Sequence, residues 1–321
     1  MARFLARRFF FAVVLIALSS SSALVLARLA PGDMTAQLGP FASTVEVENT
    51  RARFDLDRTP ASQWWLWVTR AARFDFGDSF LYNRPVGPLV MRAAANTTLL
   101  GIVSLTVATV VGLSLGVFTG VRSGVLPMAV RGVSLVCISL PPLVTSLALV
   151  FLAARTGWLP AGGMLSATAG DPGWSAWIVD VLVHLPLPVL ALAIPMAATF
   201  ERLQSQAMSE AVHQPFVLAA IARGVPARRV LLRHAWPSSV RPICAVYGLA
   251  VGALLSGSFI VEFVTAWPGL GRLTFEALRA RDVYLVAACA AAGAAFLAIG
   301  TLAGDLLLAA ADPRVRQDHT A

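Results

Sequence analysis

The sequence has no lysine and few charged residues of any kind. Only 13% of its 321 residues are charged, whereas 57% are hydrophobic, and the mean hydropathy is +0.74. Soluble domains carry roughly 25% charged residues, so the charges here are too few to cover a surface that faces water. The missing lysine also excludes a Walker A loop, because that loop needs a lysine to reach the phosphates of ATP. The composition therefore indicates a membrane protein without a nucleotide-hydrolysing site of this kind.

Cysteine is scarce too, and its three copies indicate neither disulfides nor a metal site. Cys137, Cys244 and Cys289 each lie in an apolar stretch, and their spacing is not that of metal ligands. We interpret them as small apolar packing residues. No nucleophile–base–acid set and no dense His/Cys cluster is evident, which argues against an enzyme acting covalently on a substrate.

Six long uncharged windows dominate what the sequence does contain. A membrane-spanning helix needs about 20 mainly apolar residues, and the windows meet that length without the alternation typical of a barrel strand. The sequence therefore predicts an all-α polytopic membrane protein with six transmembrane helices. The windows are residues 9–27, 93–121, 132–154, 181–200, 242–261 and 283–304.

The distribution of arginine predicts the orientation. Arg3, Arg7 and Arg8 precede the first window, which resembles a secretory leader but is long for one, so we expect a retained first helix. With six spans both termini lie on one side. Once residues 30–92 are excluded for their length, most of the remaining arginines lie in segments on that side, so the positive-inside rule predicts that both termini are cytoplasmic.

Two longer hydrophilic segments remain. Residues 30–92 form an extracytoplasmic insert whose Trp64, Trp65 and Trp67 fit either an interfacial belt or a small packed cap. Residues 201–241 form the cytoplasmic segment between the fourth and fifth spans.

Proline and glycine divide that cytoplasmic segment into short helices. Pro215 suits the first position of a helix in which Phe216, Ala219 and Ala220 follow near-helical spacing. Gly224 is expected to end this helix in the left-handed conformation. Pro226 is expected to start the next helix, and Pro237 and Pro242 to break the start of the fifth span.

A short helix held between two turns suggests a docking element, and small side chains at Ala219 and Ala220 would let another surface approach it. An ordinary basic loop remains the alternative at this point.

The same segment resembles the cytoplasmic signature of bacterial ABC importer permeases. The signature's alanine pair, glycine and proline match Ala219-Ala220, Gly224 and Pro237 at the right spacing. Its glutamate, isoleucine and leucine positions hold Leu218, His234 and Trp236 instead, and the departure at Leu218 puts one docking contact in doubt.

Other pieces, in family order, resemble the dipeptide/oligopeptide/nickel branch of that family. They are spread over nearly the whole chain and are Arg28-Leu29-Ala30-Pro31-Gly32-Asp33, Asp75-Phe76-Gly77-Asp78-Ser79, Arg84-Pro85-Val86, Gly157-Trp158-Leu159-Pro160 with Gly162-Gly163, Arg223-Gly224, Arg228-Arg229-Val230-Leu231-Leu232-Arg233-His234-Ala235, Trp267-Pro268-Gly269-Leu270-Gly271-Arg272 and Asp312-Pro313-Arg314.

The resemblance implies a type I permease fold in the bacterial inner membrane. Its parts would be a transmembrane helix at 1–29, the insert at 30–92, a five-helix core at 93–310 and a cytoplasmic tail at 311–321. It also implies partners: a second, similar permease subunit, two ATPase subunits that hold ATP and Mg²⁺, and an extracytoplasmic solute-binding protein. We expect no cofactor on this chain itself and no interaction with nucleic acid.

Three ionisable residues near or within the spans are candidate pathway residues. Asp180 and His184 share a helix face at the outer end of the fourth span, where a simple interfacial pair is favoured over a metal or substrate site. Asp305 lies late in the sixth span.

Breaks at Pro141-Pro142 and at Pro186, Pro188 and Pro195 are expected to kink the third and fourth spans. Separately, Gly112, Gly116 and Gly120 form a small-residue stripe suited to close helix packing. These are mechanical features, and they carry no information about specificity.

The function expected is ATP-driven import by alternating access. Peptides are favoured over nickel or another small solute, because metal-type ligands are few. A membrane scaffold or receptor without transport is the rival from another class, and a membrane-embedded enzyme is a further one.

Overall fold

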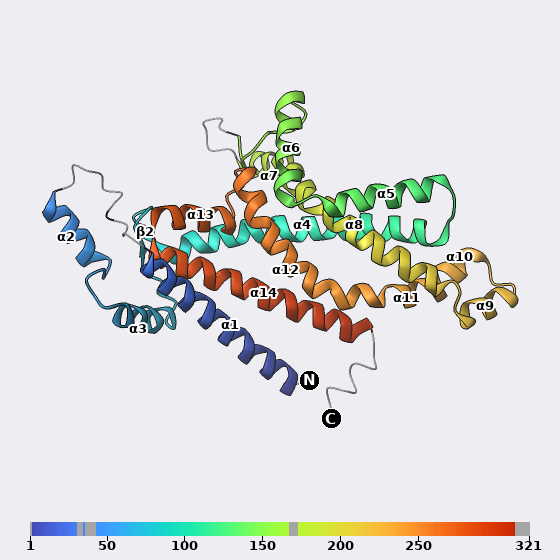
Figure 1. Cartoon of the computed structure of the whole chain (residues 1–321), viewed down its shortest axis with the longest axis horizontal. Coiled ribbons are helices and arrows are strands. Elements are labelled where there is room, and N and C mark those ends of the chain that lie inside the picture. The colour runs from blue at the N-terminus through green and yellow to red at the C-terminus, as the bar shows by residue number, and fades with distance from the viewer. Residues whose placement is uncertain (1, 31–34, 36–42, 167–172, 312–321) are drawn as a thin grey trace. The chain divides into compact units, whose positions relative to one another are not determined.

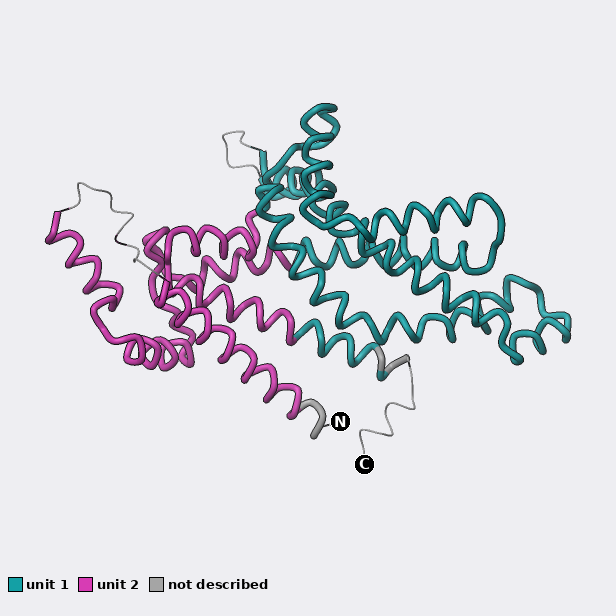
Figure 2. The backbone as a smooth tube through the Cα atoms, in the orientation of Figure 1, with its two compact units in different colours: residues 1, 99–267, 299–321 teal, residues 2–98, 268–298 magenta. Residues whose placement is uncertain are grey.

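The computed structural model describes residues 2–30, 35, 43–166 and 173–311, and most of these are helical (Figure 1). Two compact units are distinguished (Figure 2). Unit 1 takes its described residues from 99–267 and 299–311, and unit 2 takes its own from 2–98 and 268–298. The motif residues Pro31–Asp33 and Asp312–Arg314, and with them the expected tail beyond 311, lie outside the described residues.

Unit 2 begins with α1 (Ala2–Leu29), α2 (Thr44–Arg53) and α3 (Pro60–Ala71). The side chains of Ser43 and Thr59 cap α2 and α3 by accepting hydrogen bonds from backbone amides in the first turns. An antiparallel hairpin pairs β1 (Asp78–Ser79) with β2 (Arg84–Pro85). The unit is completed by the first part of α4 (Val86–Val121), by α13 (Leu270–Ala280) and by the first part of α14 (Val283–Ala311).

The insert contributes to a hydrophobic core of its own unit. Phe54, Leu56 and Trp67 are buried there together with the start of α14. Trp67 is only 4% exposed, whereas Trp65 is 63% exposed. Of the two sequence-based alternatives for this tryptophan cluster, the packed cap is therefore confirmed for Trp67, and Trp65 points outward.

Unit 1 contains the remaining helices (Figure 1). They are the rest of α4, α5 (Val125–Ser139), α6 (Pro142–Thr156), α7 (Trp174–His184), α8 (Pro186–Ala211), α9 (Pro215–Ala222), α10 (Ala227–Val230), α11 (Trp236–Ser239), α12 (Arg241–Val264) and the end of α14.

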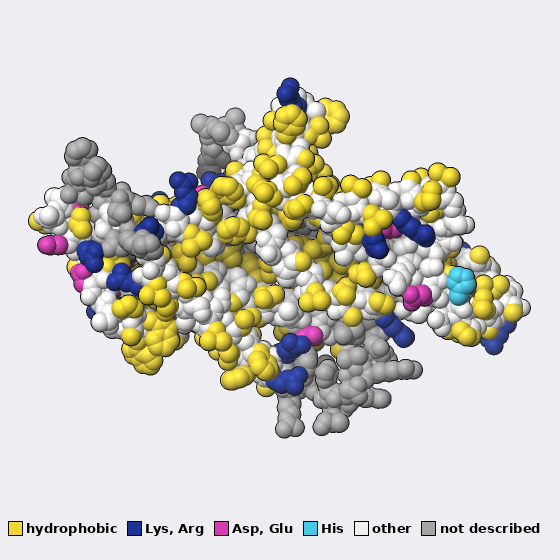
Figure 3. Space-filling model, viewed as in Figure 1, with side chains coloured by type: hydrophobic (Ala, Val, Ile, Leu, Met, Phe, Trp, Pro, Cys, Tyr) yellow, Lys and Arg dark blue, Asp and Glu magenta, His cyan; other side chains and the backbone are white. Residues whose placement is uncertain are grey.

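Among the described residues, five helices are long and apolar enough to cross a membrane, and a bent pair of helices could form a sixth crossing. The five are Ala6–Leu29, Val86–Val121, Pro186–Ala211, Arg241–Val264 and Val283–Leu307. Hydrophobic side chains cover much of the surface seen over α5, α6 and α12 in Figure 3. Such exposure fits contact with lipid or with a partner, and the all-α polytopic fold is confirmed.

The third expected span differs from a straight helix. Residues 132–154 are divided between α5 and α6, and the chain direction bends by 105° from one helix to the other. Pro142 has no N–H to continue the ladder, and a residue that precedes proline is driven into extended backbone. Leu140 and Pro141 are indeed extended, so α5 ends at Ser139 and α6 starts at Pro142.

The prolines of the fourth span behave differently from one another. Pro186 lies in the first turn of α8, as expected of a helix start, but α8 continues through Pro195. Because Pro195 cannot donate to the carbonyl of Ala191, that carbonyl needs another donor. The hydroxyl of Thr145 on α6 supplies it, at 3.2 Å.

The glycine stripe of α4 packs closely, as the sequence predicts, and the structure shows that its partner is α8. A Cβ atom on Gly112 would lie 2.6 Å from the carbonyl oxygen of Ala197, and one on Gly116 would lie 2.5 Å from Cβ of Gln204. Gly120 is equally close to α8. The two helices therefore touch almost backbone to backbone along three turns.

Candidate functional site

The segment between α8 and α12 presents a short helix at the far end of unit 1. In Figure 1, α9 lies beyond the end of α8, and α10 and α11 lead back to α12. Pro215 is in the first turn of α9, and Pro226 immediately precedes α10, as the sequence predicts. A π-helical turn at Leu231–Ala235 and α11, with Pro237 in its first turn, complete the return.

Gly224 ends α9 in a Schellman motif. Its φ is +77°, a value that favours glycine. The amide of Val225 donates to the carbonyl of Ala220 at 3.2 Å, and the amide of Gly224 donates to that of Ile221 at 2.9 Å. The expected left-handed stop is confirmed, and it fixes the direction in which the chain leaves α9.

α9 has one face turned to its own unit and another turned outward. Val217 and Ala220 are buried in a small core that includes Met208, Val230 and Ala235. Phe216 is 49% exposed, and Ala219 is exposed beside it. The alanine pair is thus divided: Ala220 anchors the helix, and Ala219 belongs to the outward face.

The outward face is apolar although it lies outside the expected spans. Leu218 and Ile221 are 51% and 54% exposed, in addition to Phe216. Leu218 stands where the permease signature has glutamate, so a hydrophobic side chain occupies that place. A small exposed apolar face on a rigidly capped helix is suited to contact with another protein.

A buried polar cluster, which the sequence analysis missed, ties α8 to its neighbours. Glu201 and Gln204 on α8 are both 0% exposed. The hydroxyl of Thr119 on α4 donates to Oε1 of Glu201 at 2.5 Å, and the side-chain amide of Gln204 donates to the hydroxyl of Ser239 at 2.8 Å. The signal in the sequence was a glutamate directly after an apolar window, which we assigned to the hydrophilic segment.

Asp180 and His184 are brought together on α7, as predicted. Their Oδ1 and Nδ1 atoms are 3.4 Å apart. Asp180 is held mainly by Ser166, whose amide and hydroxyl donate to its carboxylate at 2.6 and 2.7 Å. These hydrogen bonds from Ser166 are the main cause of a lowered pKa of Asp180, with a small contribution from His184. Asp305 lies on another helix, α14.

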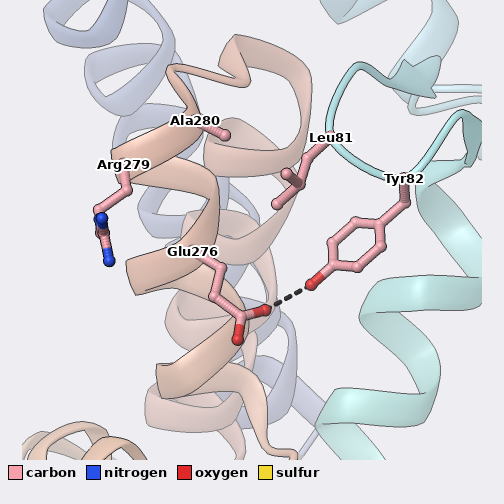
Figure 4. Close-up of a pocket in the computed structure, with 5 residues that line it drawn as sticks. All are labelled: Leu81, Tyr82, Glu276, Arg279 and Ala280. Carbon is pink, nitrogen blue, oxygen red and sulfur yellow. Dashed lines mark hydrogen bonds between the residues drawn. The ribbon is translucent and has the colours of Figure 1, made fainter. Parts of the chain in front are cut away.

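Unit 2 carries a second polar arrangement around α13. The hydroxyl of Tyr82 donates to Glu276 (Figure 4). Glu276 also accepts from Nε of Arg272 at 2.9 Å. A cavity of about 540 Å³ lies beside this pair. Burial, followed by the hydrogen bond to Glu276, raises the pKa of Tyr82, so its hydroxyl stays protonated as the donor.

Asp282 stabilises the end of β1 in the same unit by hydrogen bonds to Ser79 and Leu81. Its Oδ2 atom accepts from the hydroxyl of Ser79 at 2.6 Å and from the amide of Leu81 at 3.2 Å. Burial raises the pKa of Asp282, although these hydrogen bonds act in the opposite direction. Within the described residues, no group of three or more His, Cys, Asp or Glu side chains could hold a metal ion.

Comparisons with known proteins show the family to which this chain of apolar helices belongs. The chain is 32% identical, over 98% of its length and 99% of the relative's, to the oligopeptide transport system permease protein OppB of Mycobacterium bovis. It is 28% identical, with the same coverage, to the oligopeptide transport system permease protein AppB of Bacillus subtilis. Residues 112–317 match the binding-protein-dependent transport system inner membrane components. This chain belongs to that family, and it is therefore a multi-pass membrane subunit of an ABC transporter.

Proposed function

We propose that this chain is a permease subunit of an ATP-driven importer of short peptides. The peptide class is supported by the names of its relatives from Mycobacterium bovis and Bacillus subtilis. A second permease subunit would complete the pathway, and an extracytoplasmic binding protein would deliver the peptide. Nickel or another small solute, and a scaffold without transport, are the alternatives; ATP-dependent uptake of peptide but not of nickel by the unmodified transporter would exclude them.

The observation that carries the proposal is the outward face of α9. Phe216 and Ala219 lie on a helix fixed by Pro215 at its start and by Gly224 at its end. We propose that this face docks on an ATPase subunit, which would hold ATP and Mg²⁺, and that closure of the ATPases moves α9. The small core under α9 would transmit the movement to α8 and, through α10 and α11 with Pro237, to α12.

The remaining assignments follow from this role. Both termini and α9 would lie in the cytoplasm, with residues 30–92 outside and 93–310 forming the permease core. Asp180 and His184 would stabilise the outer end of that core, and Asp305 would lie late in its last span. The chain itself would carry no ATPase site and no cofactor.

The test is a set of substitutions in the complete transporter, reconstituted with its ATPases and binding protein. Ala219→Trp should reduce ATPase co-purification and peptide uptake at least about tenfold, because a bulky side chain on the docking face costs well over 1.4 kcal/mol of association. Gly224→Pro should act similarly, because proline cannot adopt a positive φ. Ala61→Trp, on an exposed position of α3, is the matched control. Unchanged assembly and uptake in both α9 variants would show that the docking assignment is wrong.

A further inference from the structure

The outward side of α3 carries an exposed tryptophan, although this helix lies in the insert and not in a span. Gln63 and Trp67 are buried on one side of α3, at 0% and 4% exposure. Trp65 lies two residues from each of them, and residues two apart on a helix point to nearly opposite sides. Its side chain is 63% exposed and lies beside that of Trp64, with 6.2 Å between the ring centroids. Figure 3 shows hydrophobic side chains gathered over α3.

The rest of this outward side offers few groups that need water. The exposed residues that share it with Trp65 are Ala61, Ser62, Thr69 and Ala72. Oγ of Ser62 donates to the carbonyl of Thr59 at 2.9 Å. The hydroxyl of Thr69 donates to the carbonyl of Leu66 at 2.8 Å. A hydroxyl that is already hydrogen-bonded costs little to remove from water, so this side of α3 can face the boundary of a lipid bilayer.

The packing of α3 on α1 fixes its depth in the membrane. α1 is long and apolar enough to cross a bilayer over Ala6–Leu29, and α3 contacts it. Leu24 of α1 is 0% exposed and belongs to the same hydrophobic core as Trp67. Leu24 lies about 7.5 Å along the helix axis from Leu29, at 1.5 Å per residue. α3 therefore lies beside the end of a span, where the hydrocarbon meets the headgroups.

The charge of α3 fits the same level. Residues 58–74 contain no acidic side chain, and Arg70 and Arg73 lie at the end of the helix. Arg70 is 3.7 Å from Asp55. Arg73 is exposed, and no ion pair of its guanidinium is found within the described part of the chain. Basic side chains beside an apolar helical face are typical of helices that lie on phospholipid headgroups.

We propose that α3 is an interfacial helix, which lies among the phospholipid headgroups of the leaflet in which α1 ends. Trp65 would insert between the lipids, because an indole has an apolar body and a polar N–H that suits this boundary. Arg73 would pair with a lipid phosphate. The insert would thus be anchored to the bilayer and not stand free in water. This inference concerns the membrane contact of the insert, and it holds for any transported substrate.

The test measures how often a spin label collides with oxygen, which concentrates in lipid, and with a nickel–EDDA complex, which stays in water. It uses the complete transporter in nanodiscs of phosphatidylcholine and phosphatidylglycerol. The label is attached at Trp65→Cys after alanine has replaced the three native cysteines. Glu48→Cys, at an exposed position of α2, is the matched control. We expect oxygen collisions to predominate at residue 65 and nickel collisions at residue 48.

Removal of the charge of Arg73 should shift the label at residue 65 toward water. A basic residue near an anionic surface contributes about 1 kcal/mol, so Arg73→Gln should lower the ratio of lipid-facing to water-facing label about fivefold. Arg51→Gln is the control for charge, because Arg51 is already paired with Asp57 at 3.0 Å, and it should cause no shift. An unchanged ratio with Arg73→Gln would overturn the phosphate contact.

Equal collision ratios at residues 65 and 48 would overturn the proposal as a whole. A label at residue 65 that is shielded from nickel only after the binding protein is added would also overturn it, since this side of α3 would then be a protein-docking face. If the cysteine-free protein does not assemble, Trp65→Phe is compared with the native protein. This change should remove fluorescence that lipid brominated near its headgroup quenches. Loss only of fluorescence that aqueous iodide quenches would contradict the insertion of Trp65.

Discussion

At the scale of single residues, the side chains that matter most are those whose partners are distant in the sequence. Ser166 holds Asp180 across 14 residues, and Thr119 meets Glu201 across 82. The sequence analysis found the Asp180–His184 pair because residues four apart on a helix are neighbours by geometry. It missed Glu201 because nothing in the local sequence shows that α4 and α5 cover this position.

The Ser166–Asp180 contact should respond to acid. The pKa of Asp180 lies below its usual 3.8, so the hydrogen bonds stabilise the structure above that pH. The contribution is lost as the pH falls through the lowered pKa, because the protonated carboxyl is a poorer acceptor. We expect Asp180→Asn to increase hydrogen exchange at Ser166 at neutral pH. The unmodified protein should show the same increase only once the pH has fallen below this lowered pKa, which itself lies below 3.8.

His184→Gln is the matched control for that experiment. Because His184 contributes little to the lowered pKa of Asp180, this change should leave the exchange of the Ser166 amide almost unaltered. A large increase in exchange with His184→Gln would mean that the histidine, and not Ser166, holds Asp180.

At the scale of helices, proline and glycine were informative wherever their effect is local. They predict the ends of α9, the start of α10 and the break between α5 and α6, since each depends on a missing N–H or a positive φ. They do not predict the 105° angle at that break or the continuity of α8 through Pro195. Both depend on packing and on a hydroxyl from another helix.

The contact between α4 and α8 should tolerate no added methyl group. Gly116→Ala would place a Cβ atom 2.5 Å from Cβ of Gln204, so the helices must separate. We expect the free energy of unfolding to fall by about 1–3 kcal/mol, measured by thermal or denaturant unfolding in detergent. Gly132→Ala, inside α5 with no atom within 4 Å of the new Cβ, should be neutral or slightly stabilising. Equal effects of the two substitutions would contradict the packing described.

At the scale of the whole molecule, composition alone predicted the class of protein. The shortage of charge and the six long apolar windows, which lack the alternation of barrel strands, indicate a polytopic membrane protein whose spans satisfy their backbone as helices. The two compact units could not be predicted in this way. Unit 2 joins the insert to residues 268–298, which are far away in the sequence, and its core forms only when the chain returns.

The orientation of the molecule gives a prediction about its accessible segments. If both termini are cytoplasmic, a reporter that is active only outside the cell membrane should be inactive when fused after Ala321. The same reporter should be active when inserted at Arg58, in the turn between α2 and α3. A control insertion at Arg223, after α9, should be inactive. Activity at Arg223 together with inactivity at Arg58 would reverse the topology proposed above.

The hydroxyl of Thr145, which replaces the amide that Pro195 lacks, makes the effects of substitutions depend on their order. While residue 195 is proline, Thr145→Val leaves the carbonyl of Ala191 without a hydrogen-bond donor inside the protein, so it should lower the free energy of unfolding. Once Pro195→Ala has restored the helical amide, Thr145→Val should leave the free energy of unfolding almost unchanged. Coupling between residues in direct contact is typically 0.5–3 kcal/mol. Evolution of this helix pair would therefore be contingent: a lineage could lose the hydroxyl only after it had lost the proline.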